Sequence, residues 1–315
     1  MIRSEPLSLR LRESRPLSPT LRHLSLDASD GGLLPTSMPG AHLSLTLAGR
    51  QRTFRNSYSI VSRHDERAHY EIIVRRTAES RGGSAFIYDE LRVGDVISAS
   101  TPNSQFPLQN LARKHLLIAG GIGITPMLSF LAALRERQQA LELHQVARMA
   151  EVEVVEKLLG SFASHDINIH AGRSTLRLDE VLARQPLGTH VYCCGPQALM
   201  DAVDAAAAAT GWPASHVHRE NFGAAGGEPF TVRLAKSGRE IAVGEHETML
   251  EALENAGVPM ASLCRGGACG ECRTGLLDGT PDHRDHFLTD SEKASCTAIM
   301  PCVSRAKTSS LTIDL

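Results

Sequence analysis

The sequence of 315 residues contains no apolar run near the roughly 18 residues that a membrane-spanning helix requires, so no segment is expected to cross a membrane. Its first residues, Met-Ile-Arg-Ser-Glu-Pro, lack the apolar core of a secretory signal. The formal net charge of -2 argues against a nucleic-acid-binding protein. Internal repeats and extended low-complexity tracts are also absent. These absences predict a cytoplasmic protein that binds neither nucleic acid nor membranes.

Cysteine is scarce too, because seven cysteines in a chain of this length, without a secretory segment, do not suggest a disulfide framework. Four of them have four, two and 29 residues between successive members, the pattern of plant-type 2Fe-2S ferredoxins. Three ligands on one loop would wrap one side of a cluster, and the fourth would come from a distant segment. Glycines in the loop allow backbone N–H groups to approach the sulfides closely. The predicted ligands are Cys264, Cys269, Cys272 and Cys302.

Other roles for these cysteines have to be weighed. Structural zinc sites usually pair two Cys-x2-Cys knuckles or add histidines at fixed spacing, and only Cys269 and Cys272 form such a knuckle here. Cys296 also follows the knuckle and is a second candidate for the fourth ligand. We favour Cys302 because it lies farther along the chain. We expect Cys296 to be a small buried core residue, the usual state of a free cysteine.

Up to about residue 105, the pattern predicts short β-strands. Leu7, Leu9 and Leu11 alternate with polar residues, and turns rich in Gly, Pro, Asp and Asn separate the segments that follow. Several short strands with turn signals between them favour an antiparallel barrel or sandwich. Further strands are expected at residues 42–47, 57–62, 70–75 and 95–100.

One segment in this part presents an unusual set of side chains. On a strand, Arg55, Ser57 and Ser59 would share one face, and Tyr58 would take the other. A cation, hydroxyl groups and an aromatic ring on one element suit a flat ring that carries a phosphate tail. An exposed arginine beside an ordinary barrel tyrosine is the simpler interpretation.

A glycine-rich turn precedes a short predicted helix in the same part. Gly82, Gly83 and Ser84 lead into an apolar-periodic segment at residues 85–91. The first turn of a helix presents free backbone N–H groups at the positive end of the dipole, which suits a phosphate. Without further context, Ser84 is more often an ordinary N-cap.

Between residues 106 and 224, strands alternate with helices, which is typical of a doubly wound parallel sheet. One predicted strand ends in Gly120-Gly-Ile-Gly-Ile-Thr-Pro126, and another ends in Cys194-Gly-Pro196. Both turns lead into predicted helices, the place where parallel sheets bind nucleotides. The first turn is not the Rossmann fingerprint, because proline stands three positions after Gly123. Cys194 is expected at the ligand-facing rim. Strands are expected at residues 115–119, 141–146, 167–171, 190–193 and 216–221, and a helix at 197–209.

A small polar stretch at residues 223–228 separates a third part of the chain. A hairpin is expected at residues 230–243 and a helix around 249–256, ahead of the cysteine loop. Gly257 suits the C-terminal end of that helix. Strand, strand, helix and loop in under ninety residues fit a small α+β domain.

Together, the cysteine loop, the two glycine turns and the Arg…Tyr-Ser strand resemble the phthalate dioxygenase reductase family, the single-chain reductases of Rieske oxygenases, and especially its carnitine monooxygenase reductase-like members. The resemblance covers nearly the whole chain. It is close in Cys264–Cys272, Asp282-His-Arg-Asp285 and Cys302-Val-Ser-Arg-Ala306. It implies a multidomain fold: an antiparallel β-barrel flavin domain at 1–105, an NAD-binding α/β domain at 106–224 and a β-grasp 2Fe-2S ferredoxin domain at 229–315.

The resemblance also implies roles for single residues. The cysteines Cys264, Cys269, Cys272 and Cys302 match the cluster ligands. FMN contacts are implied for Arg55, Tyr58, Ser59, Gly82, Gly83 and Ser84. NADH contacts are implied for Gly121, Gly123 and Thr125, with Cys194, Gly195 and Pro196 near the nicotinamide ring.

The sequence departs from the family pattern at two places. Two residues separate Arg55 from Tyr58, where many members have one, although carnitine-type members share the longer spacing. Gln145 and Ala147 stand where the family usually has aromatic and hydroxyl residues, which leaves the choice between NADH and NADPH open. Arg148 and Arg173 are candidates for holding an additional phosphate.

The implied domains form a redox chain. A nicotinamide releases two electrons as hydride, a 2Fe-2S cluster accepts one at a time, and a flavin can divide the pair. The resemblance therefore implies the reductase component of a two-component Rieske-type oxygenase, in which no side chain acts as a catalytic acid or base. We expect a monomer that passes electrons to a terminal oxygenase. A reductase for a diiron or haem monooxygenase and a redox sensor without nicotinamide turnover are the alternatives.

Overall fold

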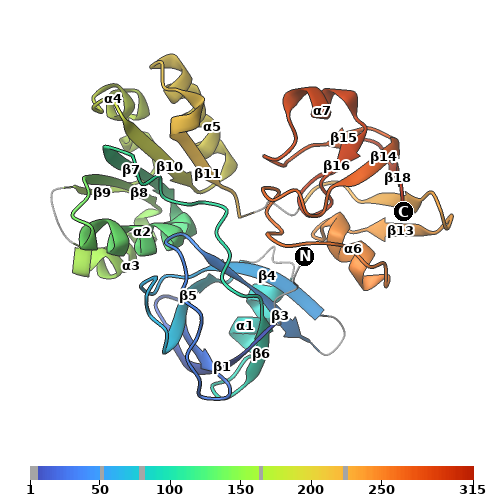
Figure 1. Cartoon of the computed structure of the whole chain (residues 1–315), viewed down its shortest axis with the longest axis horizontal. Coiled ribbons are helices and arrows are strands. Elements are labelled where there is room, and N and C mark those ends of the chain that lie inside the picture. The colour runs from blue at the N-terminus through green and yellow to red at the C-terminus, as the bar shows by residue number, and fades with distance from the viewer. Residues whose placement is uncertain (1–5, 50–52, 78–81, 163–165, 223–225) are drawn as a thin grey trace. The chain divides into compact units, whose positions relative to one another are not determined.

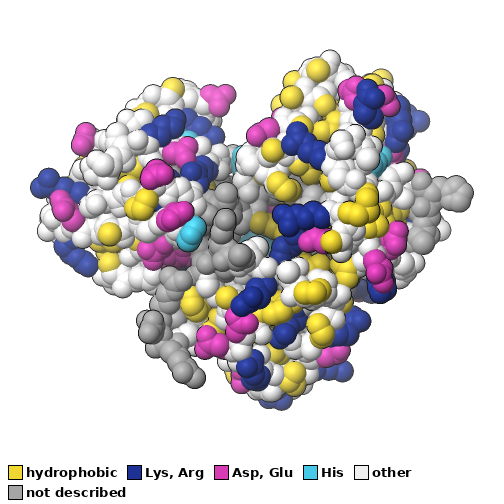
Figure 2. Space-filling view, turned by 180° about the vertical axis from the view of Figure 1, so that it is seen from behind, with side chains coloured by type: hydrophobic (Ala, Val, Ile, Leu, Met, Phe, Trp, Pro, Cys, Tyr) yellow, Lys and Arg dark blue, Asp and Glu magenta, His cyan; other side chains and the backbone are white. Residues whose placement is uncertain are grey.

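The computed structural model, drawn in Figure 1, describes residues 6–49, 53–77, 82–162, 166–222 and 226–315. Within these ranges no helix is long and apolar enough to span a membrane. On the face seen in Figure 2, basic and acidic side chains are interspersed, in keeping with the small net charge. The chain divides into two compact units, of which the first comprises residues 1–43, 58–75 and 91–222, and the second 44–57, 76–90 and 223–315.

A six-stranded sheet forms the amino-terminal part, in the order β4-β3-β6-β1-β2-β5. A bridge between Ile60 and Ile72 links the chain after β4 to β5 and closes the sheet into a barrel. Leu9 and Leu11 are buried, whereas Arg10 between them is exposed, so β1 has one inward and one outward face. The elements are β1 (Leu7–Pro16), β2 (Leu21–Ala28), β3 (His42–Ala48), β4 (Thr53–Ser59), β5 (His69–Arg75), α1 (Gly83–Asp89) and β6 (Val96–Ala99).

A parallel five-stranded sheet follows, in the order β11-β10-β7-β8-β9. Its strands are β7 (Lys114–Gly120), β8 (Leu141–Ala147), β9 (Ile167–Ala171), β10 (Thr189–Cys194) and β11 (Val217–Glu220). Its α-helices are α2 (Ile124–Glu136), α3 (Val152–Leu159), α4 (Leu178–Ala183) and α5 (Gln197–Ala209). The 3-10 helices are η1 (Gly121–Gly123), η2 (Met149–Glu151), η3 (Gly160–Phe162), η4 (Arg173–Thr175) and η5 (Ala214–His216).

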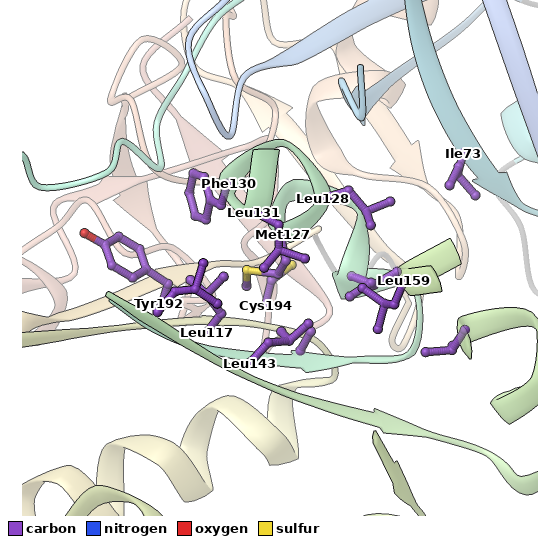
Figure 3. Close-up of a cluster of buried hydrophobic side chains, with 14 of the residues drawn as sticks. Ile73, Leu117, Met127, Leu128, Phe130, Leu131, Leu143, Leu159, Tyr192 and Cys194 are labelled. Atoms are coloured by element: carbon purple, nitrogen blue, oxygen red, sulfur yellow. The ribbon is translucent and has the colours of Figure 1, made fainter. Parts of the chain in front are cut away.

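Hydrophobic side chains cover both faces of this sheet. On one face, Leu117 and Leu143 pack with Phe130 of α2 in the cluster drawn in Figure 3. On the other face, Leu116 packs with Val203 of α5. Each such fully buried side chain stabilises the fold by about 1.5–3 kcal/mol. Because both faces are covered, the ends of the strands are left for a ligand.

The carboxyl-terminal part is a mixed sheet in the order β13-β12-β18-β14-β16, with β12 parallel to β18 and its other pairs antiparallel. The side chain of Thr248 accepts the Glu251 N–H at 3.1 Å and begins α6 with a capping box. The elements are β12 (Phe230–Leu234), β13 (Glu240–Val243), α6 (Met249–Asn255), β14 (Thr274–Asp278), β15 (Pro281–Asp282), α7 (Asp290–Ser295), β16 (Ala298–Ile299), β17 (Arg305–Ala306) and β18 (Ser310–Ile313).

Most predicted elements are confirmed, including the hairpin of β12 and β13 and the helix α5. The strand expected at residues 57–62 lies earlier, as β4 at Thr53–Ser59. The elements without a counterpart among the predicted ones are β2, α3, α4, α7 and β14 to β18. In β2, Ser25 is buried and His23 is half-buried, so the alternation of apolar and polar residues that marks a strand is lost.

Candidate functional site

The four predicted cluster cysteines lie together in the second unit. Cys264, Cys269 and Cys272 lie between α6 and β14, and Cys302 lies between β16 and β17. The thiol of Cys269 is hydrogen-bonded to Cys264 and that of Cys302 to Cys272, and Cys264 is close enough to act electrostatically on both Cys272 and Cys302. Cys269 is partly exposed, whereas the other three are buried. The described residues contain no preformed metal site, but four thiols gathered in two hydrogen-bonded pairs match the ligand set of a 2Fe-2S cluster.

Hydrogen bonds prepare two of these thiols to lose their protons. The Cys269 thiol and backbone N–H groups, among them that of Gly266 at 3.4 Å, donate to Cys264 and lower its pKa to about 5. A hydrogen bond from Cys302 likewise lowers the pKa of Cys272. Donating these bonds raises the pKa of Cys269 and Cys302. Since iron binds thiolates, two of the four predicted ligands are prepared for metal binding, and the other two have to lose their protons when the metal binds.

Two loop glycines are required by close packing. Gly267 has a φ of +76°, and a Cβ there would lie 2.6 Å from Val303 Cγ2. Gly270 has a φ of +79°, and its Cβ would lie 2.2 Å from the Phe287 ring. Both positions therefore exclude other residues by conformation and by space.

The expectation that Cys296 is a buried core residue is wrong. Cys296 is exposed and ends α7 in the left-handed conformation, with a φ of 50°. Its thiol donates to the Lys293 carbonyl at 3.5 Å. The helix α7 buries none of its residues, so a cysteine at its end remains at the surface.

Polar groups around β4 and α1 fit a flavin. A Cβ on Gly83 would lie 2.1 Å from Asn56 Oδ1, so this glycine closely faces the strand. Asn56 Oδ1 and Ser59 Oγ are buried and have no hydrogen-bond partner among the described residues. Gly82 is left-handed at the N-cap of α1, and Tyr58 is half-buried on β4. A bound flavin would supply partners for these unpaired atoms.

In the second unit, β4 also contacts the cysteine loop. Ser57 Oγ donates to the Cys264 carbonyl at 3.4 Å. Arg55 lies 3.3 Å from the Glu254 carboxylate, which also pairs with Arg265. In this arrangement, the guanidinium predicted to hold a phosphate is engaged by a carboxylate. The other predicted phosphate contacts, Gly82, Gly83 and Ser84, lie at the N-cap and in the first turn of α1.

The two glycine turns of the parallel sheet pack directly against each other. A Cβ on Gly123 would lie 2.1 Å from the Cys194 carbonyl oxygen, and a Cβ on Gly195 would lie 3.0 Å from Gly120 Cα. Pro196 follows as the N-cap of α5. Contact between the two turns is thus a physical reason for these glycines, in addition to the approach of a ligand.

The first turn holds its shape through Thr125, whose hydroxyl donates to the Ile122 carbonyl at 3.0 Å. Cys194 ends β10 at the predicted edge, but its side chain is fully buried in the cluster of Figure 3. Burial raises the pKa of its thiol well above the ordinary value. The backbone of Cys194, rather than its sulfur, is therefore the part that meets the glycine turn.

Three polar residues around Gly121 are absent from the predicted site. The Arg75 guanidinium lies 3.7 Å from the Cβ position of Gly121 and is paired with Glu151 at 3.1 Å. Gln145 donates to the Gly121 carbonyl at 3.2 Å, and its buried Oε1 has no partner among the described residues. A cation and a free acceptor beside a turn with a φ of +55° are suited to a nucleotide. Of the three, only Gln145 stands out in the sequence, as a departure from the family pattern; no motif includes Arg75 or Glu151.

Comparison with known proteins identifies the family. The chain is 38% identical to the carnitine monooxygenase reductase subunit of Escherichia coli, over 98% of each chain. The solved structure of phthalate dioxygenase reductase matches with a TM-score of 0.82 and 37% identity, over 98% of each chain. This chain belongs to the phthalate dioxygenase reductase family. The heme-dependent oxidative N-demethylase beta subunit of Ectopseudomonas mendocina is 41% identical, over 98% of this chain and 99% of that protein.

Family models cover the chain in three segments. They are the oxidoreductase FAD-binding domain at residues 8–107, the dimethylamine monooxygenase subunit DmmA-like N-terminal domain at 96–217 and the 2Fe-2S iron-sulfur cluster binding domain at 232–307. As in phthalate dioxygenase reductase, an antiparallel flavin domain, a parallel nucleotide domain and a C-terminal ferredoxin domain make up the fold, which confirms the predicted fold class. The chain is an oxidoreductase with a flavin and a 2Fe-2S cluster, a reductase component of an oxygenase system.

Proposed function

We propose that this reductase takes hydride from NADH onto FMN and delivers single electrons through the cluster to a Rieske-type terminal oxygenase. The observation that carries the proposal is the full-length match to phthalate dioxygenase reductase together with the four converging thiols. The proposed domains are residues 1–105, 106–224 and 229–315. The protein is proposed to act as a monomer in the cytoplasm.

In this proposal, the side chains bind and orient, and none acts as an acid or base. The turns at Gly121 and Gly195 provide a backbone surface for the nicotinamide dinucleotide, with Arg75 beside the first turn. Asn56 and Ser59 offer buried polar atoms to the flavin. When bound, the flavin accepts hydride and the cluster passes electrons one at a time.

The direct test is anaerobic titration of the purified protein with NADH and then NADPH, followed by absorbance. We expect NADH to bleach the flavin and then the cluster, and NADPH to act much more slowly. A coloured protein that neither nucleotide bleaches would contradict the proposal and support the redox sensor. Mass spectrometry of the released flavin tests FMN against FAD.

A haem-containing acceptor is the second candidate, and the similarity to the heme-dependent oxidative N-demethylase beta subunit favours it. Stopped-flow mixing of the reduced protein with each acceptor separates the two. Under the leading proposal, a Rieske oxygenase is reduced within seconds and a haem acceptor remains oxidised. Rapid reduction of the haem acceptor and none of the Rieske oxygenase would contradict the leading proposal and support a haem-containing partner.

A further inference from the structure

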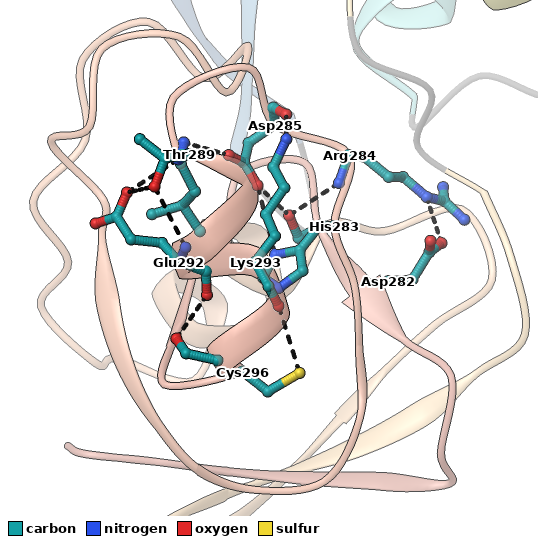
Figure 4. Close-up of polar contacts among 11 residues, drawn as sticks. Asp282, His283, Arg284, Asp285, Thr289, Glu292, Lys293 and Cys296 are labelled. Carbon is teal, nitrogen blue, oxygen red and sulfur yellow. Dashed lines mark hydrogen bonds and ion pairs between the residues drawn. The ribbon is translucent and has the colours of Figure 1, made fainter.

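A buried carboxylate lies behind the cysteine loop. Asp285, between β15 and α7, has a side chain without exposed surface and belongs to the network drawn in Figure 4. Its Oδ2 accepts the Leu288 N–H at 2.8 Å, and its Oδ1 accepts the Ser304 hydroxyl at 3.3 Å. The Arg284 N–H donates to the same Ser304 oxygen at 3.2 Å, so the hydroxyl proton is left for Asp285. The carboxylate therefore joins the start of α7 to the segment after Cys302.

The backbone of Asp285 also packs against the cysteine loop. A Cβ on Gly267 would lie 3.1 Å from Asp285 Cα and 2.6 Å from Val303 Cγ2, so Gly267 is enclosed between them. The His286 N–H donates to the Gly267 carbonyl at 3.0 Å. Val303, which encloses Gly267 on its other side, directly follows Cys302 in the chain. Asp285 thus packs against a residue of the cysteine loop that also lies against the neighbour of Cys302.

A lysine and a histidine lie near the carboxylate. Lys293 Nζ lies 2.8 Å from the Asp285 carbonyl, and His283 Nδ1 lies 3.6 Å from Oδ1. The lysine is partly exposed, so water and salt screen its charge. The enclosed carboxylate is screened much less, because the dielectric response of a protein interior is weaker than that of water.

We infer that Asp285 is a positioning residue for the 2Fe-2S cluster: it ties the Cys264–Cys272 loop to the Cys302 segment, and its buried negative charge lowers the reduction potential. The inference rests on the proposed assignment of the cluster to the four cysteines. Nearby charge and hydrogen bonds to the sulfurs both tune the potential of such clusters. A fixed negative charge opposes the addition of an electron, and a tie between the loop and the Cys302 segment fixes how the ligands on the two segments lie relative to each other.

Two variants of the full-length reconstituted protein separate the tie from the charge. Ser304→Ala removes the tie and keeps the charge, so we expect shifted g-values in the electron paramagnetic resonance spectrum and at least tenfold faster iron release to a chelator. Asp285→Asn keeps the shape and removes the charge. We expect its midpoint potential to rise by at least 59 mV, which for one electron corresponds to a tenfold change in the reduction equilibrium.

Two controls match these variants. Asp290→Asn makes the same charge change at an exposed position of α7, and Val232→Ala weakens the core of the same domain away from the network. Both controls should keep the g-values and the potential of the wild type. The inference is overturned if Asp285→Asn has the potential of Asp290→Asn, or if Ser304→Ala keeps the wild-type g-values and releases iron no faster than Val232→Ala. A wild-type protein that shows no 2Fe-2S spectrum after reconstitution would instead overturn the cluster assignment.

Discussion

Replacing Gly123 by alanine should disable the nucleotide site without unfolding the protein. The added Cβ would lie 2.1 Å from the Cys194 carbonyl oxygen and 2.5 Å from its carbon, both backbone atoms. Since close carbon–oxygen contacts are about 3.3 Å or longer, the two turns must separate by roughly 1 Å. A misplacement of about 1 Å can reduce a rate on the order of 100-fold, whereas overpacking destabilises a fold by only about 1–3 kcal/mol. We expect flavin reduction by NADH to slow about 100-fold in a folded protein.

The assay is anaerobic stopped-flow absorbance of the flavin after mixing with NADH. Gly160→Ala is the matched control, because a Cβ at Gly160 meets nothing within 4 Å and its φ of -56° suits alanine. Dithionite should reduce the flavin and the cluster equally in both variants, which shows that the cofactors are intact. If Gly123→Ala reduced its flavin at the wild-type rate with unchanged NADH dependence, the turn would have no part in nucleotide binding and the reasoning would be refuted.

Three further predictions concern other parts of the chain. Cys296→Ser should keep the full iron content and Cys302→Ser should lose the cluster, as measured by iron assay and absorbance; the reverse would make Cys296 the fourth ligand. Burial opposes ionisation of Glu142, but hydrogen bonds from four side chains prevail and lower its pKa. The stability that the ionised Glu142 contributes is therefore present above about pH 4.5 and is lost as the pH falls below this value. Glu142→Gln should lower the free energy of unfolding at pH 7 by about 3 kcal/mol. An unchanged midpoint of urea unfolding would contradict this. Burial and neighbouring histidines lower the pKa of His218 to about 4, so only the unfolded chain gains this proton near pH 5. His218→Gln should therefore reduce the loss of stability between pH 7 and 5 by about 1–2 kcal/mol, and melting curves that keep the wild-type pH dependence would exclude it.

Features governed by local rules could be predicted from the sequence, and features set by distant contacts could not. The cysteine spacing identifies the cluster loop, because a small cluster restricts the spacing of its ligands. The glycine at position 195 is visible in the sequence, but its contact with Gly120 joins residues 75 positions apart. The burial of Cys296 is mispredicted because the prediction rests on the usual state of a free cysteine, whereas the polar sequence Asp290-Ser-Glu-Lys-Ala-Ser295 before it indicates an exposed helix. Arg75 reaches the nucleotide turn from the barrel, so no motif includes it.

Long-range contacts also explain the arginines of the two motifs beside the cysteines, Arg284 and Arg305. Arg305 is 2% exposed, and it donates to four backbone carbonyls. Two of them are those of Gly227, at 3.1 Å, and Glu228, at 2.9 Å. Arg284 donates to the Gly226 carbonyl at 2.7 Å. Burial lowers the pKa of Arg305, and these bonds offset the cost of burying the cation, although its Nε has no partner among the described residues. A planar guanidinium can bond several carbonyls in different directions, which a lysine cannot. Because Arg305 is three residues from Cys302, the contacts that hold residues 226–228, just before the proposed ferredoxin domain, also hold the segment of the predicted fourth ligand.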